Sequence, residues 1–174
     1  MNAMTAQFSR ATITELPPAT RISLRLADRK AAAAALGFDL PARIGTRFAA
    51  GARSALCLGP DEWLIEAPAG DSAALAAALA DLATRQPLSA VEVSDREITL
   101  TLTGPAVLDL LATGCPLDLA NMPVGGGTRT VFDSAQIVLT REAADRFHLT
   151  IWRSFAPHVR ALLDLAGREL AAGL

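Results

Sequence analysis

The 174-residue sequence is poor in several residue types that carry particular functions. It has no tyrosine, two histidines and two cysteines, and aromatic residues make up 5% of it. Cys57 and Cys115 lie far apart without a partner motif, which argues against a disulfide framework or a zinc site. No stretch approaches the roughly 20 apolar residues of a membrane span. We therefore expect a reduced, soluble, cytoplasmic protein that does not bind a membrane.

Basic residues are limited as well, because Lys30 is the only lysine and the formal net charge is −2. Nucleic-acid-binding domains usually carry a basic face, so nucleic acid is not an expected partner. Gly125, Gly126 and Gly127 are not followed by the lysine of a phosphate-binding loop, and the dinucleotide-binding glycine pattern is missing. His148 and His158 have no metal ligands at suitable spacing. We predict no catalytic, cofactor-binding or metal-binding residue in this chain.

Periodic hydrophobic segments are present in two similar runs. The first run predicts a strand over 20–27, an alanine-rich helix between Asp28 and Gly37, a hairpin over 54–58 and 62–67, a helix over 71–85 and a strand over 88–94. The second run predicts a strand over 96–103, a short helix ending near Gly114, strands near 128–132, 136–141 and 146–152, and a helix over 154–171.

The two runs share the order strand, helix, long loop, hairpin, helix, which indicates an internal duplication. The proposed matches are Ile22, Leu24 and Leu26 with Ile98, Leu100 and Leu102; Trp63 with Phe147; and Leu75 and Leu79 with Val159 and Leu163. We predict an α+β fold of two such halves, with a mainly antiparallel sheet, helices on one side and one shared core. Residues 20–174 would form a single domain, and residues 1–19 a flexible tail.

Several segments resemble the gamma subunit family of heterotetrameric sarcosine oxidase, in the family's order and over roughly residues 20 to 170. They are Leu58-Gly59-Pro60-Asp61-Glu62-Trp63-Leu64, Leu102-Thr103-Gly104-Pro105-Ala106 with Leu110-Leu111, Gly114-Cys115-Pro116-Leu117-Asp118-Leu119, Arg129-Thr130, and Arg153-Ser154-Phe155-Ala156. The family is similar in fold to the folate-binding aminomethyltransferases. The resemblance therefore implies a duplicated α+β fold, in agreement with the two runs.

The resemblance also implies a function. The bacterial complex demethylates sarcosine to glycine, forms hydrogen peroxide and passes a one-carbon unit to tetrahydrofolate. Its alpha and beta subunits would be the partners of this chain and would hold FAD, FMN, NAD and tetrahydrofolate. The gamma chain would support assembly and stability without catalytic residues of its own. The alternative is a free-standing folate-binding or tRNA-modification-related protein of the same fold, for which the candidate pterin-binding acids are Asp95, Glu97 and Asp118.

A subunit without its own chemistry must recognise its partners, and arginine and aromatic residues mark such surfaces. The loops 42–53 and 121–129 contain such residues, and so does the strand-to-helix junction 150–156. We therefore predict partner contacts at Arg43, Arg47, Phe48, Arg53, Arg129, Trp152 and Arg153. For Trp152 and Phe155, a place in the core with Ser154 as the helix cap is an equally open interpretation.

Overall fold

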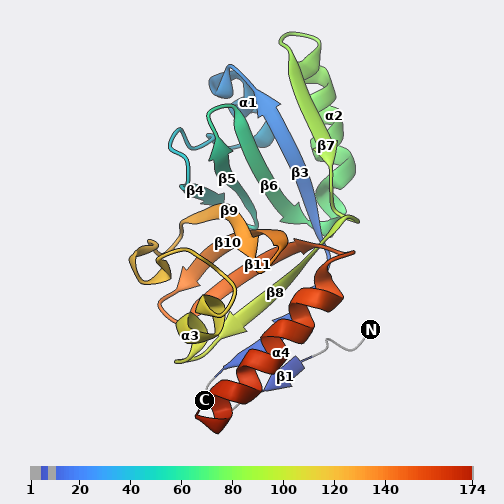
Figure 1. The fold of residues 1–174 in the computed structure, drawn as a ribbon. Coiled ribbons are helices and arrows are strands. Elements are labelled where there is room, and N and C mark those ends of the chain that lie inside the picture. The colour runs from blue at the N-terminus through green and yellow to red at the C-terminus, as the bar shows by residue number, and fades with distance from the viewer. Residues whose placement is uncertain (1–4, 8–10, 174) are drawn as a thin grey trace. The chain divides into compact units, whose positions relative to one another are not determined.

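The chain forms two compact units in the computed structural model, which describes residues 5–7 and 11–173 (Figure 1). One unit contains residues 18–94, and the other contains residues 95–174 together with the described part of residues 1–17. We call them the 18–94 unit and the 95–174 unit. The chain passes between the units at Pro17–Pro18 and at Ser94–Asp95.

The 18–94 unit is a five-stranded sheet in the order β4-β5-β6-β3-β7, and every pair is antiparallel. Its core lies between one face of the sheet and two helices, with Leu24, Trp63 and Leu79 among the buried side chains. Asp28 accepts a hydrogen bond from the Lys30 amide at the start of α1, and Gly37 ends that helix in the left-handed conformation. The elements are β3 Ala19–Leu26, α1 Arg29–Leu36, β4 Arg47–Ala50, β5 Arg53–Gly59, β6 Glu62–Pro68, η1 Ala69–Asp71, α2 Ser72–Ala83 and β7 Leu88–Glu92.

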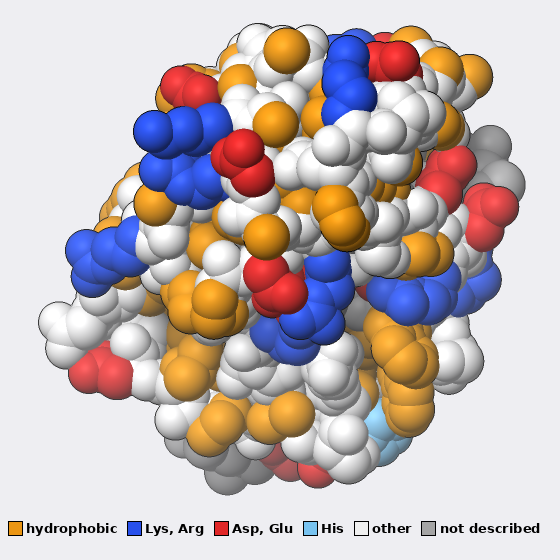
Figure 2. All heavy atoms as spheres, turned by 90° about the horizontal axis from the view of Figure 1, so that it is seen from above, with side chains coloured by type: hydrophobic (Ala, Val, Ile, Leu, Met, Phe, Trp, Pro, Cys, Tyr) orange, Lys and Arg blue, Asp and Glu red, His pale blue; other side chains and the backbone are white. Residues whose placement is uncertain are grey.

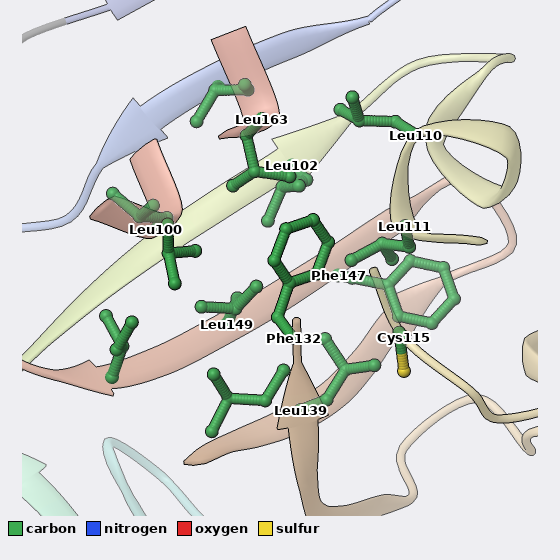
Figure 3. Packing of buried hydrophobic residues seen from close by; sticks show 14 of the residues in the cluster. Leu100, Leu102, Leu110, Leu111, Cys115, Phe132, Leu139, Phe147, Leu149 and Leu163 are labelled. Carbon is green, nitrogen blue, oxygen red and sulfur yellow. The ribbon is translucent and has the colours of Figure 1, made fainter. Parts of the chain in front are cut away.

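The 95–174 unit is a six-stranded antiparallel sheet in the order β1-β2-β8-β11-β10-β9. Leu100, Leu102, Phe147 and Leu149 project from its central strands toward α3 and α4, as Figure 3 shows for the buried cluster. The elements are β1 Thr5–Gln7, β2 Thr12–Glu15, β8 Glu97–Thr103, α3 Val107–Ala112, η2 Leu119–Asn121, β9 Gly127–Phe132, β10 Ala135–Ala143, β11 Arg146–Trp152 and α4 Ala156–Ala172.

The duplication is confirmed by strand order. In each unit the first strand is followed by a helix, a loop, three strands of a meander and a second helix, and the first strand pairs with the third strand of the meander. Trp63 and Phe147 are both the second residue of that third strand. Leu75 and Val159 are both the fourth residue of the helix that follows it.

The predicted match of the first strands is wrong by two residues. Leu24 lies opposite Trp63, whereas Leu102, not Leu100, lies opposite Phe147. Leu24 therefore corresponds to Leu102, and Ile22 corresponds to Leu100. A strand repeats its pattern every two residues, so alternation alone cannot distinguish a register from one that is shifted by two.

The expectation of one shared core is also wrong, because the buried hydrophobic residues form two clusters, one in each unit. Each sheet is wide enough to carry its own pair of helices. Each unit can therefore bury one face of its sheet by itself.

The prediction of a flexible tail over residues 1–19 is wrong for the residues of this segment that form strands. Thr12–Glu15 form β2 and pair with β8, and Ile13 is fully buried in the core of the 95–174 unit. The short Thr-Ile-Thr alternation suits a strand of a sheet with one covered face, and β1 lies on the outer side of β2. Residues 1–4 and 8–10, also predicted as tail, lie outside the described residues.

The two predicted loops are shorter than expected. Arg47–Ala50 form the edge strand β4 and pair with β5 through a two-residue turn at Gly51. Gly127–Arg129 belong to β9 and pair with β10. β4 has four residues without clear alternation, so the sequence pattern did not reveal it, whereas the strand predicted near 128–132 is confirmed as β9.

Candidate interaction surfaces

Four predicted contact residues lie in the 18–94 unit, on and around the edge strand β4; Arg53 is the first residue of β5. Arg43 and Phe48 are exposed, and Phe48 stacks on Phe38 with the ring centroids 6.0 Å apart. Arg47 is half-buried within β4. Arg53 has an internal role instead, because its Nε donates to Asp71 Oδ2 at 2.7 Å and its guanidinium reaches the Leu36 carbonyl oxygen. The structure therefore favours Arg43 and Phe48 over Arg53 as contact residues.

The other three predicted residues lie in the 95–174 unit. Trp152 is 38% exposed and Phe155 is 42% exposed, with their ring centroids 6.3 Å apart, so the interpretation that places both in the core is wrong. Arg96 lies over the Trp152 ring at 4.9 Å. Arg153 donates from Nε to the Asp95 carbonyl oxygen at 3.0 Å. We call Arg96, Trp152, Arg153 and Phe155 the aromatic–arginine cluster.

Ser154 does not cap the last helix, contrary to the sequence interpretation. The N-cap of α4 is Phe155, with no side-chain hydrogen bond, and Pro157 occupies the first turn. Proline is favoured there because it has no amide hydrogen to satisfy. Arg129 is exposed on β9 opposite Val138, which lies opposite Thr150 of β11 on its other side.

Arg141, which the sequence analysis did not single out, holds the long loop before β9. Its guanidinium donates to the carbonyl oxygens of Leu119, Ala120 and Met122 at 3.1, 3.1 and 2.7 Å. The same group lies over the Phe147 ring at 5.3 Å. A planar guanidinium can donate several hydrogen bonds at once, so one side chain fixes a loop of little regular structure.

The equivalent loop of the 18–94 unit is held by different side chains. Trp63, the counterpart of Phe147, donates from Nε1 to the Pro41 carbonyl oxygen at 2.8 Å, and Arg29 donates to that of Leu40 at 2.9 Å. Both loops end in an exposed β-branched residue before a left-handed glycine: Ile44 (53% exposed) precedes Gly45, and Val124 (60% exposed) precedes Gly125. Each unit thus presents an apolar side chain on an anchored loop.

On the face seen in Figure 2, small groups of hydrophobic side chains lie between basic ones. A protein–protein contact does not require a larger apolar area than this, because arginine and aromatic side chains provide much of the binding energy.

The three acids considered for pterin binding have local roles. Asp118 Oδ2 accepts from Asn121 Nδ2 at 2.7 Å, which closes the η2 turn. Glu97 is 8% exposed, and its Oε1 forms an ion pair with the Arg96 guanidinium at 2.7 Å. Asp95 is exposed and its carbonyl oxygen accepts from Arg153. Asp61, in the β5–β6 turn, accepts two hydrogen bonds from Arg25 of β3 at 2.8 and 3.0 Å, which connects the turn to the neighbouring strand.

Both histidines contact a carboxylate. His148 Nδ1 lies 3.6 Å from Glu142 Oε1, which also accepts from Thr140. His158 Nε2 lies 3.0 Å from Asp133 Oδ2 in the β9–β10 turn. The His158 contact and the Ser134 hydrogen bonds lower the pKa of Asp133 from 3.8 to about 2. Asp133 is exposed at the end of a hairpin, which suits a surface link between the turn and α4.

The cysteines are both buried and free, and burial raises the pKa of the Cys57 thiol. Within residues 5–7 and 11–173, no three His, Cys, Asp or Glu side chains lie close enough together to bind a metal ion. No helix in the described part of the chain is long and apolar enough to cross a membrane.

The arrangement found here matches known proteins. The model of the sarcosine oxidase gamma subunit family matches residues 25–169. The chain belongs to this family. It is 33% identical over 142 residues to the gamma subunit of Corynebacterium sp. strain P-1, covering 77% of this chain and 67% of that subunit. It is 37% identical over 110 residues to the gamma subunit of an Arthrobacter species, which covers 60% of this chain and only 53% of the relative.

Solved structures agree with this assignment. Heterotetrameric sarcosine oxidase from Corynebacterium sp. U-96 contains a chain that matches with a TM-score of 0.86 and 28% identity, covering 95% of this chain and 88% of that one. The glycine-cleavage aminomethyltransferase of Bartonella henselae matches with a TM-score of 0.71 at 17% identity, covering 93% of this chain and 50% of that one. The second likeness shows a shared fold and confirms the predicted similarity in fold to aminomethyltransferases.

Proposed function

We propose that this chain is the gamma subunit of a cytoplasmic heterotetrameric sarcosine oxidase and that it supports assembly and stability of the complex. The observation that carries the proposal is the likeness to a chain of the Corynebacterium sp. U-96 enzyme over 95% of this sequence. The complex would convert sarcosine to glycine and hydrogen peroxide and pass the one-carbon unit to tetrahydrofolate. The alpha and beta subunits would be the partners and would hold FAD, FMN, NAD and tetrahydrofolate.

A non-catalytic role is supported by how the polar side chains are used. Asp61, Asp118 and Asp133 each stabilise a turn or connect a turn to a neighbouring element. Arg141 and Arg53 are engaged with backbone carbonyl oxygens or a nearby carboxylate. Such side chains maintain the shape of the surface, which is what a subunit for assembly requires.

The partner contacts would come from groups on anchored loops and junctions. In the 18–94 unit, Arg43, Ile44, Arg47 and Phe48 lie on and before β4, while the 95–174 unit contributes Val124, Arg129 and the aromatic–arginine cluster. Because Arg141 and Trp63 already order the two long loops, binding would cost less conformational entropy than ordering a free loop.

A free-standing folate-binding protein remains the second candidate. It is favoured by 31% identity over 115 residues to an aminomethyltransferase from Saccharopolyspora erythraea, a match that covers 64% of this chain and 31% of that enzyme. Two observations argue against it. The Asp118 carboxylate accepts a hydrogen bond that closes a turn, and the Glu97 carboxylate forms an ion pair with Arg96, so both acids already have a partner within the chain.

Two binding experiments separate these functions. The chain is first co-expressed with tagged alpha and beta subunits of the same organism, and the purified complex is analysed by native mass spectrometry. The proposal predicts a complex that contains one copy each of the alpha subunit, the beta subunit and this chain. The isolated chain is then titrated with tetrahydrofolate. Failure to join the large subunits combined with stoichiometric folate binding would reject the proposal and support the alternative.

A further inference from the structure

Strand β7 forms an open edge of the sheet in the 18–94 unit. It pairs only with β3, and no described segment of the chain pairs with its other side. The Val93 amide donates to the Arg21 carbonyl oxygen at 2.8 Å. Because hydrogen-bonded pairs alternate along antiparallel strands, Val91 and Ser89 also bond to β3, whereas Ala90 and Glu92 direct their N–H and C=O groups to the open edge.

The duplicated fold supplies an internal template for what this edge accepts. In the 95–174 unit, β2 occupies the position of β7 beside the first strand. Ile13 lies opposite Leu102 and Ala90 lies opposite Leu24, so Ile13 and Ala90 are equivalent. The outer side of β2 carries a further strand, β1, in which Ala6 lies opposite Ile13. The same edge is therefore extended in one unit and open in the other.

Side chains around β7 leave space for an added strand. Ala90 is exposed although it lies on the helix-covered face of the sheet, opposite the buried Leu24. Helix α2, which runs beside β7 (Figure 1), directs small side chains outward. On the other face, Val91 is 53% exposed. The exposed residues of α2 include Ala73, Ala74, Ala76, Ala77, Ala80 and Ala83.

The protective devices common on natural edge strands are nearly missing here. β7 contains no proline and no lysine, and its single charged residue is Glu92. Ser72 and Ser94 donate to the Glu92 carboxylate at 2.6 and 2.7 Å, so this charge is held close to the fold. A basic side chain on an incoming strand would match it, whereas a second copy of this chain would bring another Glu92 to the same short edge.

We propose that the open edge of β7 accepts an extended segment of a large sarcosine oxidase subunit as an added antiparallel strand. This inference rests on the proposed function and names where a partner binds. The incoming segment places a small apolar residue opposite Ala90, as β1 does opposite Ile13, and a basic residue near Glu92. Backbone hydrogen bonds at Ala90 and Glu92 provide the register, and the alanine face of α2 covers the apolar side chain.

Ala90→Pro tests this directly. The substitution removes an amide that faces the open edge and leaves every bond to β3 intact, so the isolated chain should unfold within about 3 °C of the wild type. Affinity for the large subunits should fall by about tenfold, the equivalent of about 1.4 kcal/mol. Ala90→Ser, which keeps the amide, is the matched control and should bind like the wild type. Hydrogen exchange at the Ala90 amide should slow in the complex.

The outcomes are distinct. If the wild type and Ala90→Pro assemble equally well and exchange at Ala90 is unchanged, the edge is not an interface and only this inference fails. If the wild type does not assemble either, the proposed function fails together with the partner named here. A homodimer of the isolated chain that Ala90→Pro abolishes would identify a second copy as the occupant and would also overturn the inference.

Discussion

At the scale of single residues, Arg141 organises the loop that precedes β9. Its guanidinium donates hydrogen bonds to three loop carbonyl oxygens and lies over the Phe147 ring. We predict that Arg141→Ala destabilises the 95–174 unit by about 1–3 kcal/mol, because partly buried carbonyl oxygens lose a charged donor. Arg141→Lys should recover little of this loss, since an ammonium lacks the planar fork.

Urea unfolding measures the free-energy change, and hydrogen exchange over 119–126 shows whether the loop opens. Arg146→Ala is the control, because Arg146 is exposed on the neighbouring strand. Equal stability of the two alanine variants would contradict the role assigned to Arg141.

Asp133 should make the stability of the folded chain depend on pH in the acid range. Its pKa is about 2 in the folded protein, mainly through the hydrogen bond from His158. A folded pKa below the unfolded value gives stability that is present above about pH 4 and is lost as the pH falls toward 2. In Asp133→Asn this part of the pH dependence should disappear, while the left-handed backbone (φ 52°) still suits the residue.

Unfolding midpoints of the wild type and Asp133→Asn between pH 2 and 5 give the comparison. Asp95→Asn serves as the control for removal of an exposed carboxylate from the same unit. Parallel curves for the wild type and Asp133→Asn would show that the His158 contact does not form in solution.

Among the elements, the turn after α3 depends on a close approach between Gly114 and Phe132. A Cβ placed on Gly114 would lie 2.8 Å from the Phe132 ring, and Phe132 is 1% exposed. We predict that Gly114→Ala destabilises the 95–174 unit by about 1–3 kcal/mol, because the buried ring must shift. This contact gives a physical reason for glycine in the segment Gly114-Cys115-Pro116.

Thermal unfolding of Gly114→Ala measures the effect. Gly70→Ala is the matched control, since its Cβ meets nothing within 4 Å and should change stability little. A Gly114→Ala variant as stable as Gly70→Ala would refute the tight packing.

The sequence allowed most elements to be predicted, and its failures have specific causes. Hairpins and amphipathic helices have strong periods, so β5, β6, α2 and β11 were found within one or two residues. β2 and β4 were missed because each has only four residues, too few to show a clear period, and β2 in addition pairs with the distant strand β8. Likewise, Arg141 could not be recognised, because its acceptors lie 19 to 22 residues away in sequence.

At the scale of the whole molecule, the family could be predicted from motifs, but the contact surface could not. Five segments in order pointed to the sarcosine oxidase gamma subunits, and the family match over 25–169 confirms it. Tertiary contacts decide which of these side chains reach the surface. They leave Trp152 and Phe155 exposed, and they pair Arg53 with Asp71 within the same unit. Residue type alone therefore selected interface candidates without separating surface groups from structural ones.

One prediction at this scale concerns the surface before and along β4. Replacing Arg47 with Glu and Phe48 with Ser reverses a charge and removes an exposed ring, so recovery of the complex should fall. The isolated chain should stay folded, because Phe48 is 44% exposed. Co-purification and thermal unfolding of the double variant are the two measurements. Full recovery of the complex would reject this surface, and an unfolded chain would show that β4 is part of the core.

The central claim is that this chain stabilises the sarcosine oxidase complex without catalysing a reaction itself. The most direct measurement is sarcosine-dependent hydrogen peroxide formation by the large subunits, prepared with and without this chain, and by this chain alone. The account predicts no turnover by the chain alone, and a higher yield and a longer half-life of activity when it is present. Large subunits that assemble and work equally well without it, or turnover by the isolated chain, would contradict the account.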